Sequence, residues 1–212
     1  DDWSFREAAR RCRGRTDVRL EECGDAAFDA AAAPLLRFAR HDDRWLWPLA
    51  RAALGEDAVL AYVGLVVSAP GSAAQPWHAD GVALFPGAGA GLPAHALNCF
   101  VPLVDVTRDK GPTELVPGSH VATARLDAIL RRGGAPSEVF APELPVGDYL
   151  VYDQRTVHRG VPNTSGIDRP ILYLLFARPW FKEHLNFGPT SLFADSVPAK
   201  KKKRRRRDGG AS

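Results

Sequence analysis

The sequence predicts a mainly β protein, an antiparallel jelly roll with a few flanking α-helices. Three features predict this fold class: many short apolar stretches, few segments of helical periodicity, and turns rich in glycine and proline between the stretches. The chain has 212 residues, of which 45% are hydrophobic, so one domain with a sizeable core is the simplest organisation.

The first third of the chain is expected to contain one helix and the first strand. Residues 1–33 are polar and rich in alanine without clear periodicity, and we expect them to form a segment ahead of the domain. A helix is expected over residues 34–54, because Pro34 suits a first turn, an apolar stripe follows it and Gly55 can end it. Residues 58–68 are apolar on both faces, which predicts a buried strand.

The rest of the domain, expected to cover residues 34–199 in all, consists mainly of further short strands. A second helix is expected over residues 122–132, where Gly133 can end it. His95 is a lone polar residue near a strand end and is expected to be exposed. The further strands are expected at residues 96–104, 113–116, 148–152, 156–159 and 169–178.

A basic run near the C-terminus dominates the charge of the chain. The net charge is +3, yet residues 200–207 are eight consecutive lysines and arginines, so the rest of the chain is acidic. An acidic body argues against a nucleic-acid-binding surface on the folded domain. We expect residues 200–212 to be disordered, because like charges repel, and we expect nucleic acid or another polyanion to bind only there. The alternative is a tail without a specific role.

A membrane span is not expected, since no stretch approaches the roughly 20 apolar residues that a transmembrane helix needs. Three cysteines are too few for a disulfide-dependent fold, which favours an intracellular location, cytoplasmic or, given the basic run, nuclear. The chain contains no methionine, so its N-terminus is expected to be incomplete, and targeting to an organelle stays open. The oligomeric state is not predicted.

Two histidines and one aspartate form the pattern with the clearest chemistry. His78 and Asp80 are two residues apart, which places both side chains on the same side of an extended strand. His158 would have to come from a strand that folds back beside them. Two imidazoles and one carboxylate can occupy one face of an octahedral Fe(II) ion and leave the other three positions free. The motif alone is weak, and its alternative interpretation is a solvated polar loop.

Four segments together resemble the phytanoyl-CoA dioxygenase-like family of Fe(II)- and 2-oxoglutarate-dependent oxygenases. They are Gln75-Pro-Trp-His-Ala-Asp-Gly81, the stretch from Asn98 to a Pro-Gly-Ser-His sequence at His120, the stretch from Gly147 to Gly160, and Arg169-Pro-Ile-Leu-Tyr-Leu-Leu-Phe176. The resemblance covers roughly residues 57–181, and the combination is more specific than any one segment.

The resemblance implies a double-stranded β-helix, which is a cupin-like jelly roll, with flanking helices. It also implies that His78, Asp80 and His158 are the catalytic ligands of Fe(II), with 2-oxoglutarate and dioxygen as co-substrates. Arg169 lies where family members place the arginine for the far carboxylate of 2-oxoglutarate. A planar guanidinium can bind that carboxylate with two hydrogen bonds, and alternate residues of the predicted strand direct Arg169 toward an apolar interior.

Two positions depart from the family pattern near the carboxylate of the co-substrate. Many members carry a serine two residues after the second histidine, where this chain has Gly160. Many also carry a lysine on the strand before the iron motif, and none occurs around Ser68. Gln75 and Asn98 are therefore candidates for a further contact to 2-oxoglutarate, with an ordinary role in turns or backbone capping as the alternative.

The implied activity is hydroxylation of an aliphatic C–H bond in a small-molecule or acyl substrate that the sequence does not identify. Related halogenases replace the iron-binding carboxylate with a small residue that admits chloride, so Asp80 favours hydroxylation. Two alternatives stay open. One is a catalytically silent jelly roll that binds or regulates partners, and the other is a cupin-type metal enzyme without 2-oxoglutarate, for which Arg169 would be dispensable.

Overall fold

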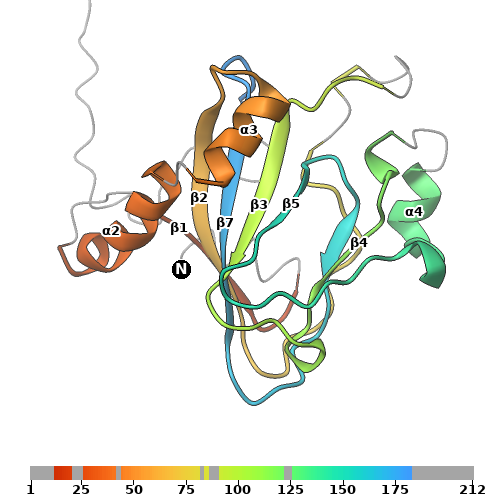
Figure 1. Cartoon of the computed structure of the whole chain (residues 1–212). Coiled ribbons are helices and arrows are strands. Elements are labelled where there is room, and N and C mark those ends of the chain that lie inside the picture. Colours follow the sequence, from red (N-terminus) through yellow and green to blue (C-terminus); the bar gives the residue numbers. More distant parts are fainter. Residues whose placement is uncertain are drawn as a thin grey trace, which may run out of the picture.

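The computed structural model describes residues 12–20, 26–41, 44–81, 84–85, 91–121 and 126–182. Figure 1 shows long neighbouring strands at the centre, with two helices along one side and a shorter strand and a further helix on the other. The predicted disordered tail, residues 200–212, lies outside the described residues. The mainly β fold with flanking helices that the sequence predicts is confirmed.

Five strands form the main sheet, and every neighbouring pair is antiparallel. Their spatial order is β1 (Arg15–Arg19), β2 (Val59–Ser68), β7 (Arg169–Ala177), β3 (Ala96–Pro102) and β5 (Leu150–Asp153). The register aligns Arg15 with Ser68, and Ser68 with Arg169, in one row across three strands. Because β7 lies between two neighbours and is covered on both faces, its sequence is a nearly continuous apolar run.

A second, narrow sheet consists of β4 (Thr113–Leu115) and β6 (His158–Gly160). Single bridges widen it on both sides, from His158 to His78 and from Leu115 to Phe140. A buried apolar cluster occupies part of the space between the two sheets and contains side chains of both, among them Leu115 and Ile171. The two sheets therefore face one another as in a jelly roll.

Two helices cover the outer face of the main sheet, namely α2 (Ala26–His41) and α3 (Leu46–Leu54). Buried side chains of both belong to one core cluster with even-numbered residues of β7, such as Leu172 and Leu174, in which α2 contacts β2 and α3 contacts β7. The odd-numbered residues of the same strand are thereby left to face the interior between the sheets.

The remaining helical segments are short and lie in the loops. They are α4 (Leu126–Arg132) and three 3-10 turns, η1 (Arg108–Lys110), η2 (Ser119–Val121) and η3 (Pro136–Glu138). Within the described ranges, none of the helices combines the length and the apolar character that crossing a membrane would require.

The prediction of one helix over residues 34–54 is wrong, because the structure has two helices there and Pro34 lies inside α2 rather than at its start. The helix α2 begins in the alanine-rich stretch, where intrinsic helix propensity is high although the apolar periodicity is poor. The prediction that His95 is exposed is also wrong. Its ring is buried against Phe181, with 4.6 Å between ring centroids, and burial lowers the pKa of this imidazole.

The strand β1 lies within the segment 1–33 that the sequence separates from the domain. It pairs along its whole length with β2, from Arg15 opposite Ser68 to Arg19 opposite Gly64. Four of its five residues are polar, so hydrophobic periodicity gave no signal for it. The boundary at residue 34 stays a prediction as a domain division, but the main sheet includes residues before it.

A close approach inside the main sheet predicts one stability effect. A Cβ on Gly64 would overlap the ring of Tyr173 on the neighbouring strand, and that ring is buried. We expect Gly64→Ala to lower the free energy of unfolding by about 1–3 kcal/mol through overpacking, measured by urea or thermal unfolding. Gly166→Ala is the control, because a Cβ there meets no atom within 4 Å. Equal stability of the two variants would contradict the overlap.

Candidate active site

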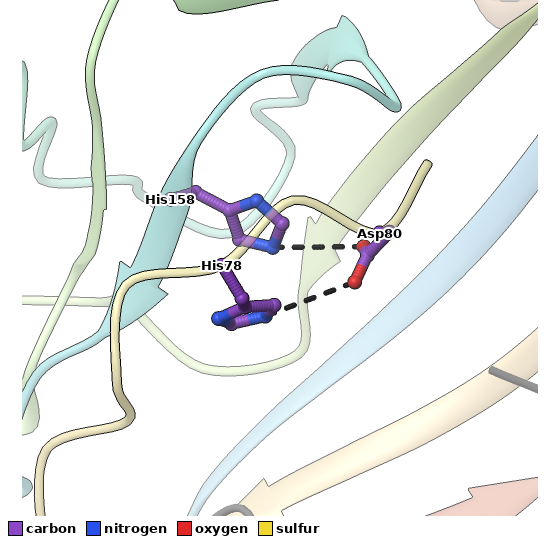
Figure 2. A group of neighbouring side chains, drawn as sticks. All are labelled: His78, Asp80 and His158. Carbon is purple, nitrogen blue, oxygen red and sulfur yellow. Dashed lines mark ion pairs between the residues drawn. The ribbon is translucent and has the colours of Figure 1, made fainter. Parts of the chain in front are cut away.

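His78, Asp80 and His158 come together in the structure, as the sequence predicts for a three-ligand site. The Nε2 atom of His78 lies 3.7 Å from Oδ1 of Asp80, and Nε2 of His158 lies 3.5 Å from Oδ2 (Figure 2). One potential ligand atom from each residue lies within 4.8 Å of the other two. In the part of the chain that the structure describes, this is the one group of three such side chains close enough to share a metal ion.

Backbone pairing positions the two histidines. The amide N of His78 donates to the carbonyl of His158 at 3.0 Å, and the amide N of His158 donates back at 2.8 Å. Directly opposed residues project side chains to the same side, so the imidazole centroids are only 4.3 Å apart. The side chain of Asp80 points to the same side because it lies two residues beyond His78, and Figure 2 shows its carboxylate next to both imidazoles.

The hydrogen bonds around the two imidazoles fix which nitrogen carries the proton. The Nδ1 atom of His78 lies 2.8 Å from the carbonyl of Pro76, and Nδ1 of His158 lies 3.0 Å from that of Thr156. A carbonyl only accepts, so each Nδ1 donates and each Nε2 presents a lone pair toward Asp80. This is the orientation in which a neutral histidine binds a metal ion.

The donor set fits a divalent metal ion by its own electrostatics. With both rings neutral, two imidazole lone pairs and a carboxylate converge on one point, where a divalent cation could bind all three. Asn98 donates from Nδ2 to Oδ2 of Asp80 at 2.7 Å, which fixes the carboxylate in this orientation. His158 is buried, whereas His78 and Asp80 keep about a fifth of their side-chain surface exposed, so the site has an open side.

The three residues line a cavity between the two sheets. Its walls come from six strands and from the segment that holds His78, so the cavity exists only in the folded jelly roll. On β7 four of the five odd-numbered residues, beginning with Arg169, line it, as the alternation of the sequence predicts. The lining residues are Arg15, Asp17, Val66, Gln75, His78, Asp80, Asn98, Phe100, Thr113, Gln154, His158, Gly160, Arg169, Ile171, Tyr173 and Leu175.

Arg169 marks a positively charged end of this cavity. Its side chain is buried, donates from Nη2 to Ser68 Oγ at 2.6 Å and from Nη1 to the carbonyl of Gly111, and leaves Nε without a partner. Burial, and then the charge of Arg15, lower the pKa of Arg169 to about 9, so the guanidinium is still charged at neutral pH. A charged donor group held at a cavity wall fits a carboxylate.

Arg15 is the cavity residue that the sequence analysis missed. Its guanidinium also donates to Ser68 Oγ, and its Nη2 donates to the carbonyl of Val161 at 2.5 Å. Among the described residues, neither Arg15 nor Arg169 has a carboxylate partner, although both side chains are buried. The only signal in the sequence was the alternation of Arg15 with Asp17, which is too short to predict a strand.

The two candidate co-substrate contacts lie in the same cavity but at different ends. Gln75 accepts with Oε1 from the backbone N of Gly160 at 2.8 Å, which fastens the segment before His78 to β6. Asn98 lies on β3 and binds Asp80, near the histidines. Contact of Gln75 or Asn98 with 2-oxoglutarate stays a prediction.

Comparison with known proteins decides the family. The sequence pattern of the family described as phytanoyl-CoA dioxygenase (PhyH) matches residues 5–171, which is most of the chain. The chain belongs to the phytanoyl-CoA dioxygenase family. This confirms the family predicted from the sequence, whose members use Fe(II), 2-oxoglutarate and dioxygen.

Two curated relatives of this family member are named as fungal dioxygenases. Dioxygenase easH of Epichloe festucae var. lolii is 35% identical over 106 residues, which are 49% of this chain and 54% of that protein. Dioxygenase hkm4 of Aspergillus hancockii is 32% identical over 121 residues, which are 56% of this chain and 38% of that protein. The chain thus spans only about a third to a half of the length of the curated relatives it matches.

Solved structures show the same fold. AviO1 from Streptomyces viridochromogenes is 25% identical with a TM-score of 0.53, and the match covers 86% of this chain and 97% of that one. HygX from Streptomyces hygroscopicus, crystallised with nickel and 2-oxoglutarate, is 17% identical with a TM-score of 0.56 over 85% of this chain and 79% of that one. At that identity HygX supports the fold alone.

Proposed function

We propose that this family member is a non-haem Fe(II)- and 2-oxoglutarate-dependent dioxygenase that hydroxylates an aliphatic C–H bond of a small-molecule or acyl substrate. The observation that carries the proposal is the placement of two complementary sites in one cavity. One site is the acceptor group of His78, Asp80 and His158, and the other is the cationic group around Arg169. A 2-oxo acid with a second carboxylate needs both sites at once.

In this proposal His78, Asp80 and His158 hold the iron and are the catalytic residues. Bound Fe(II), together with 2-oxoglutarate and dioxygen, supplies the oxidising power for C–H hydroxylation. The imidazole and carboxylate ligands leave the exposed side of the site for the co-substrates. Asp80 supports hydroxylation rather than halogenation, because its carboxylate occupies the position that related halogenases open for chloride.

Arg169 in this proposal binds the far carboxylate of 2-oxoglutarate and so directs the 2-oxo acid end toward the histidines. Gly160, on the facing sheet, lines the same cavity as Arg169. Gly160 and His158 are two residues apart on β6, a separation of roughly 6.7 Å, which is on the scale of a short dicarboxylate. The unpartnered Nε of Arg169 and the absence of a described acid beside it leave the charge of the guanidinium for the ligand.

The surroundings of His158 supply the shielding that an oxidation site needs. The rings of Tyr152 and Phe100 pack around its imidazole, with centroids 5.0 Å and 6.4 Å away. Tyr152 is buried, and burial raises the pKa of its hydroxyl, so it stays neutral at any ordinary pH. These rings exclude water from one side of the site and leave access on the side of His78.

The alternative of a cupin-type metal enzyme without 2-oxoglutarate gives Arg169 no ligand, and a buried guanidinium without an anionic partner is costly. The alternative of a silent binding protein gives the converging histidine lone pairs no cation. Binding of polyanions through residues 200–207 stays a prediction, since those residues lie outside the described ranges.

An anaerobic titration tests the proposed function directly. Purified protein with Fe(II) should develop the visible charge-transfer band of a chelated 2-oxo acid when 2-oxoglutarate is added. Exposure to air should then yield succinate. Iron binding without this band would favour the cupin-type alternative, and absence of iron binding would favour the silent one.

We predict that His78→Ala, Asp80→Ala and His158→Ala each abolish succinate formation and lower the affinity for Fe(II), while the circular dichroism spectrum stays close to wild type. Each substitution deletes one of three ligands, so the remaining two hold the ion more weakly and in a different geometry. His41→Ala is the matched control, because that histidine is exposed at the end of α2. A variant with normal iron content would remove its residue from the ligand set.

We predict that Asn98→Ala weakens Fe(II) binding by about tenfold to a hundredfold without abolishing it, since an outer hydrogen bond orients the ligand that it contacts. The hydrogen bond lost is the one from Nδ2 to Asp80, and Asn98 itself would not touch the metal. Competition with a calibrated chelator measures the affinity. If Asn98 instead contacts 2-oxoglutarate, iron affinity should stay normal and only the affinity for the co-substrate should fall.

We predict that Arg169→Ala raises the KM for 2-oxoglutarate strongly and leaves Fe(II) affinity nearly unchanged. Leaving the carboxylate without its charged partner costs roughly 2–5 kcal/mol, which is well over tenfold in affinity. Arg159→Ala is the control on β6, because Arg159 pairs with Glu114 and packs on Trp77 outside the cavity. An unchanged KM in Arg169→Ala would move the carboxylate site elsewhere.

A further inference from the structure

Arg15 has the position of a ligand-binding residue although it lies on the edge strand of the main sheet. It stands opposite Ser68, which stands opposite Arg169, so the two arginines flank one serine in a single row. Both guanidiniums donate to the same Ser68 Oγ, and both line the cavity. The edge strand thus delivers a second cation to the end of the cavity that Arg169 occupies.

The guanidinium of Arg15 lies directly beside Gly160. A Cβ added to Gly160 would lie 2.6 Å from Nη1 of Arg15, 2.8 Å from its Cζ and 2.8 Å from Oε1 of Gln75. No side chain at position 160 can therefore coexist with the guanidinium in its present place. Position 160 is also where the chain departs from the serine of many family members, so a guanidinium from β1 lies where a hydroxyl from β6 would otherwise be.

The electrostatics of the row call for an anion. Two like charges share one neutral acceptor in a buried place, which is unfavourable unless a negative group compensates them. Burial lowers the pKa of Arg15, and the charge of Arg15 contributes to the lowered pKa of Arg169. The Nε atoms of both arginines are buried and have no hydrogen-bond partner, so two charged donors are left at the cavity wall.

A purely structural role explains less of this arrangement. Arg15 does tie β1 to two loops, because its Nη2 donates to the carbonyls of Val161 and Ala73 at 2.5 Å and 3.4 Å. A neutral donor could make those contacts without the cost of burying a charge. They also leave Nε unused, and they give no reason for a second guanidinium beside the first.

We propose that Arg15 binds the far carboxylate of 2-oxoglutarate together with Arg169. This inference rests on the proposed function. It adds Arg15, which lies outside the four sequence segments that resemble the family. The two guanidiniums, held by Ser68, form one site for the second carboxylate of a dicarboxylic 2-oxo acid. Such a site selects against 2-oxo acids that lack this carboxylate, because they would leave both charges buried without a partner.

The test compares two co-substrates on the Fe(II)-loaded full chain under anaerobic conditions. Titration with 2-oxoglutarate and with 2-oxobutyrate, which lacks the far carboxylate, gives a dissociation constant for each from the charge-transfer band. We expect Arg15→Leu to weaken 2-oxoglutarate roughly tenfold to a hundredfold, the scale of a charge-assisted hydrogen bond. The affinity for 2-oxobutyrate should change by less than about threefold, since that ligand never reaches the guanidiniums.

The control is Arg19→Leu, which removes the same charge from the same strand. Arg19 stacks on Tyr62, with its Cζ 4.8 Å from the ring centroid, and lies outside the cavity lining. It should leave both affinities close to wild type. Equal losses for the two co-substrates in Arg15→Leu would mean that Arg15 only supports the structure, and unchanged affinity for 2-oxoglutarate would equally overturn the proposal. If wild-type protein gives no charge-transfer band, the proposed function fails instead.

An exchange of side chains covers the case in which Arg15→Leu does not fold. Gly160→Ser alone should weaken 2-oxoglutarate, because its Cβ displaces the guanidinium of Arg15. In an Arg15→Ala background the same serine should strengthen 2-oxoglutarate, because the flexible end of Gln75 can move aside and the hydroxyl enters the vacated space, where it can donate to the carboxylate. This reversal of sign supports a shared site, whereas a serine that weakens binding in both backgrounds contradicts it.

Discussion

The backbone pairing of His78 with His158 is the contact on which the rest of the site depends. These two residues are far apart in the chain, and two mutual hydrogen bonds of 3.0 Å and 2.8 Å place their imidazoles side by side. Asp80 then follows from strand geometry alone, and Gln75 reinforces the same pairing through Gly160. A slip of the His78 segment by one residue against β6 would turn the imidazole of His78 away from the cavity, while β4 would still hold His158 in place.

The two ends of the cavity carry different charges, because different strands line them. Lone pairs and a carboxylate converge near Asn98, and two guanidiniums converge near Ser68. The two guanidiniums alone are unfavourable in a buried place, since like charges face one another there. In the proposed function a carboxylate removes this penalty and a metal ion occupies the other end, so a chelating 2-oxo diacid suits the cavity as a whole.

The scaffold keeps these two ends at a fixed separation. The outer face of the main sheet is anchored by α2 and α3 through Leu172, Leu174 and their neighbours, so β7 cannot tilt without disturbing a packed core. On the inner face of the same strand, Arg169 and Leu175 mark the two ends of the cavity. Tyr173 lies between them and donates to Asp17 of β1 at 2.9 Å, which ties the edge strand to the centre of the sheet.

The sequence by itself determined the fold class, the family and the six residues expected at the site, all of which line one cavity. It could do so because metal and carboxylate binding require particular residue types, and because alternation on β7 fixes which residues point inward. It did not find β1, Arg15 or the break between α2 and α3. Inward-facing residues of β1 are polar because they face a charged cavity, so the apolar periodicity that identifies a strand is missing there. Only the tertiary structure decided that Asn98 contacts Asp80 and that Arg15 fills the space beside Gly160, because these contacts join strands whose register no local pattern specifies.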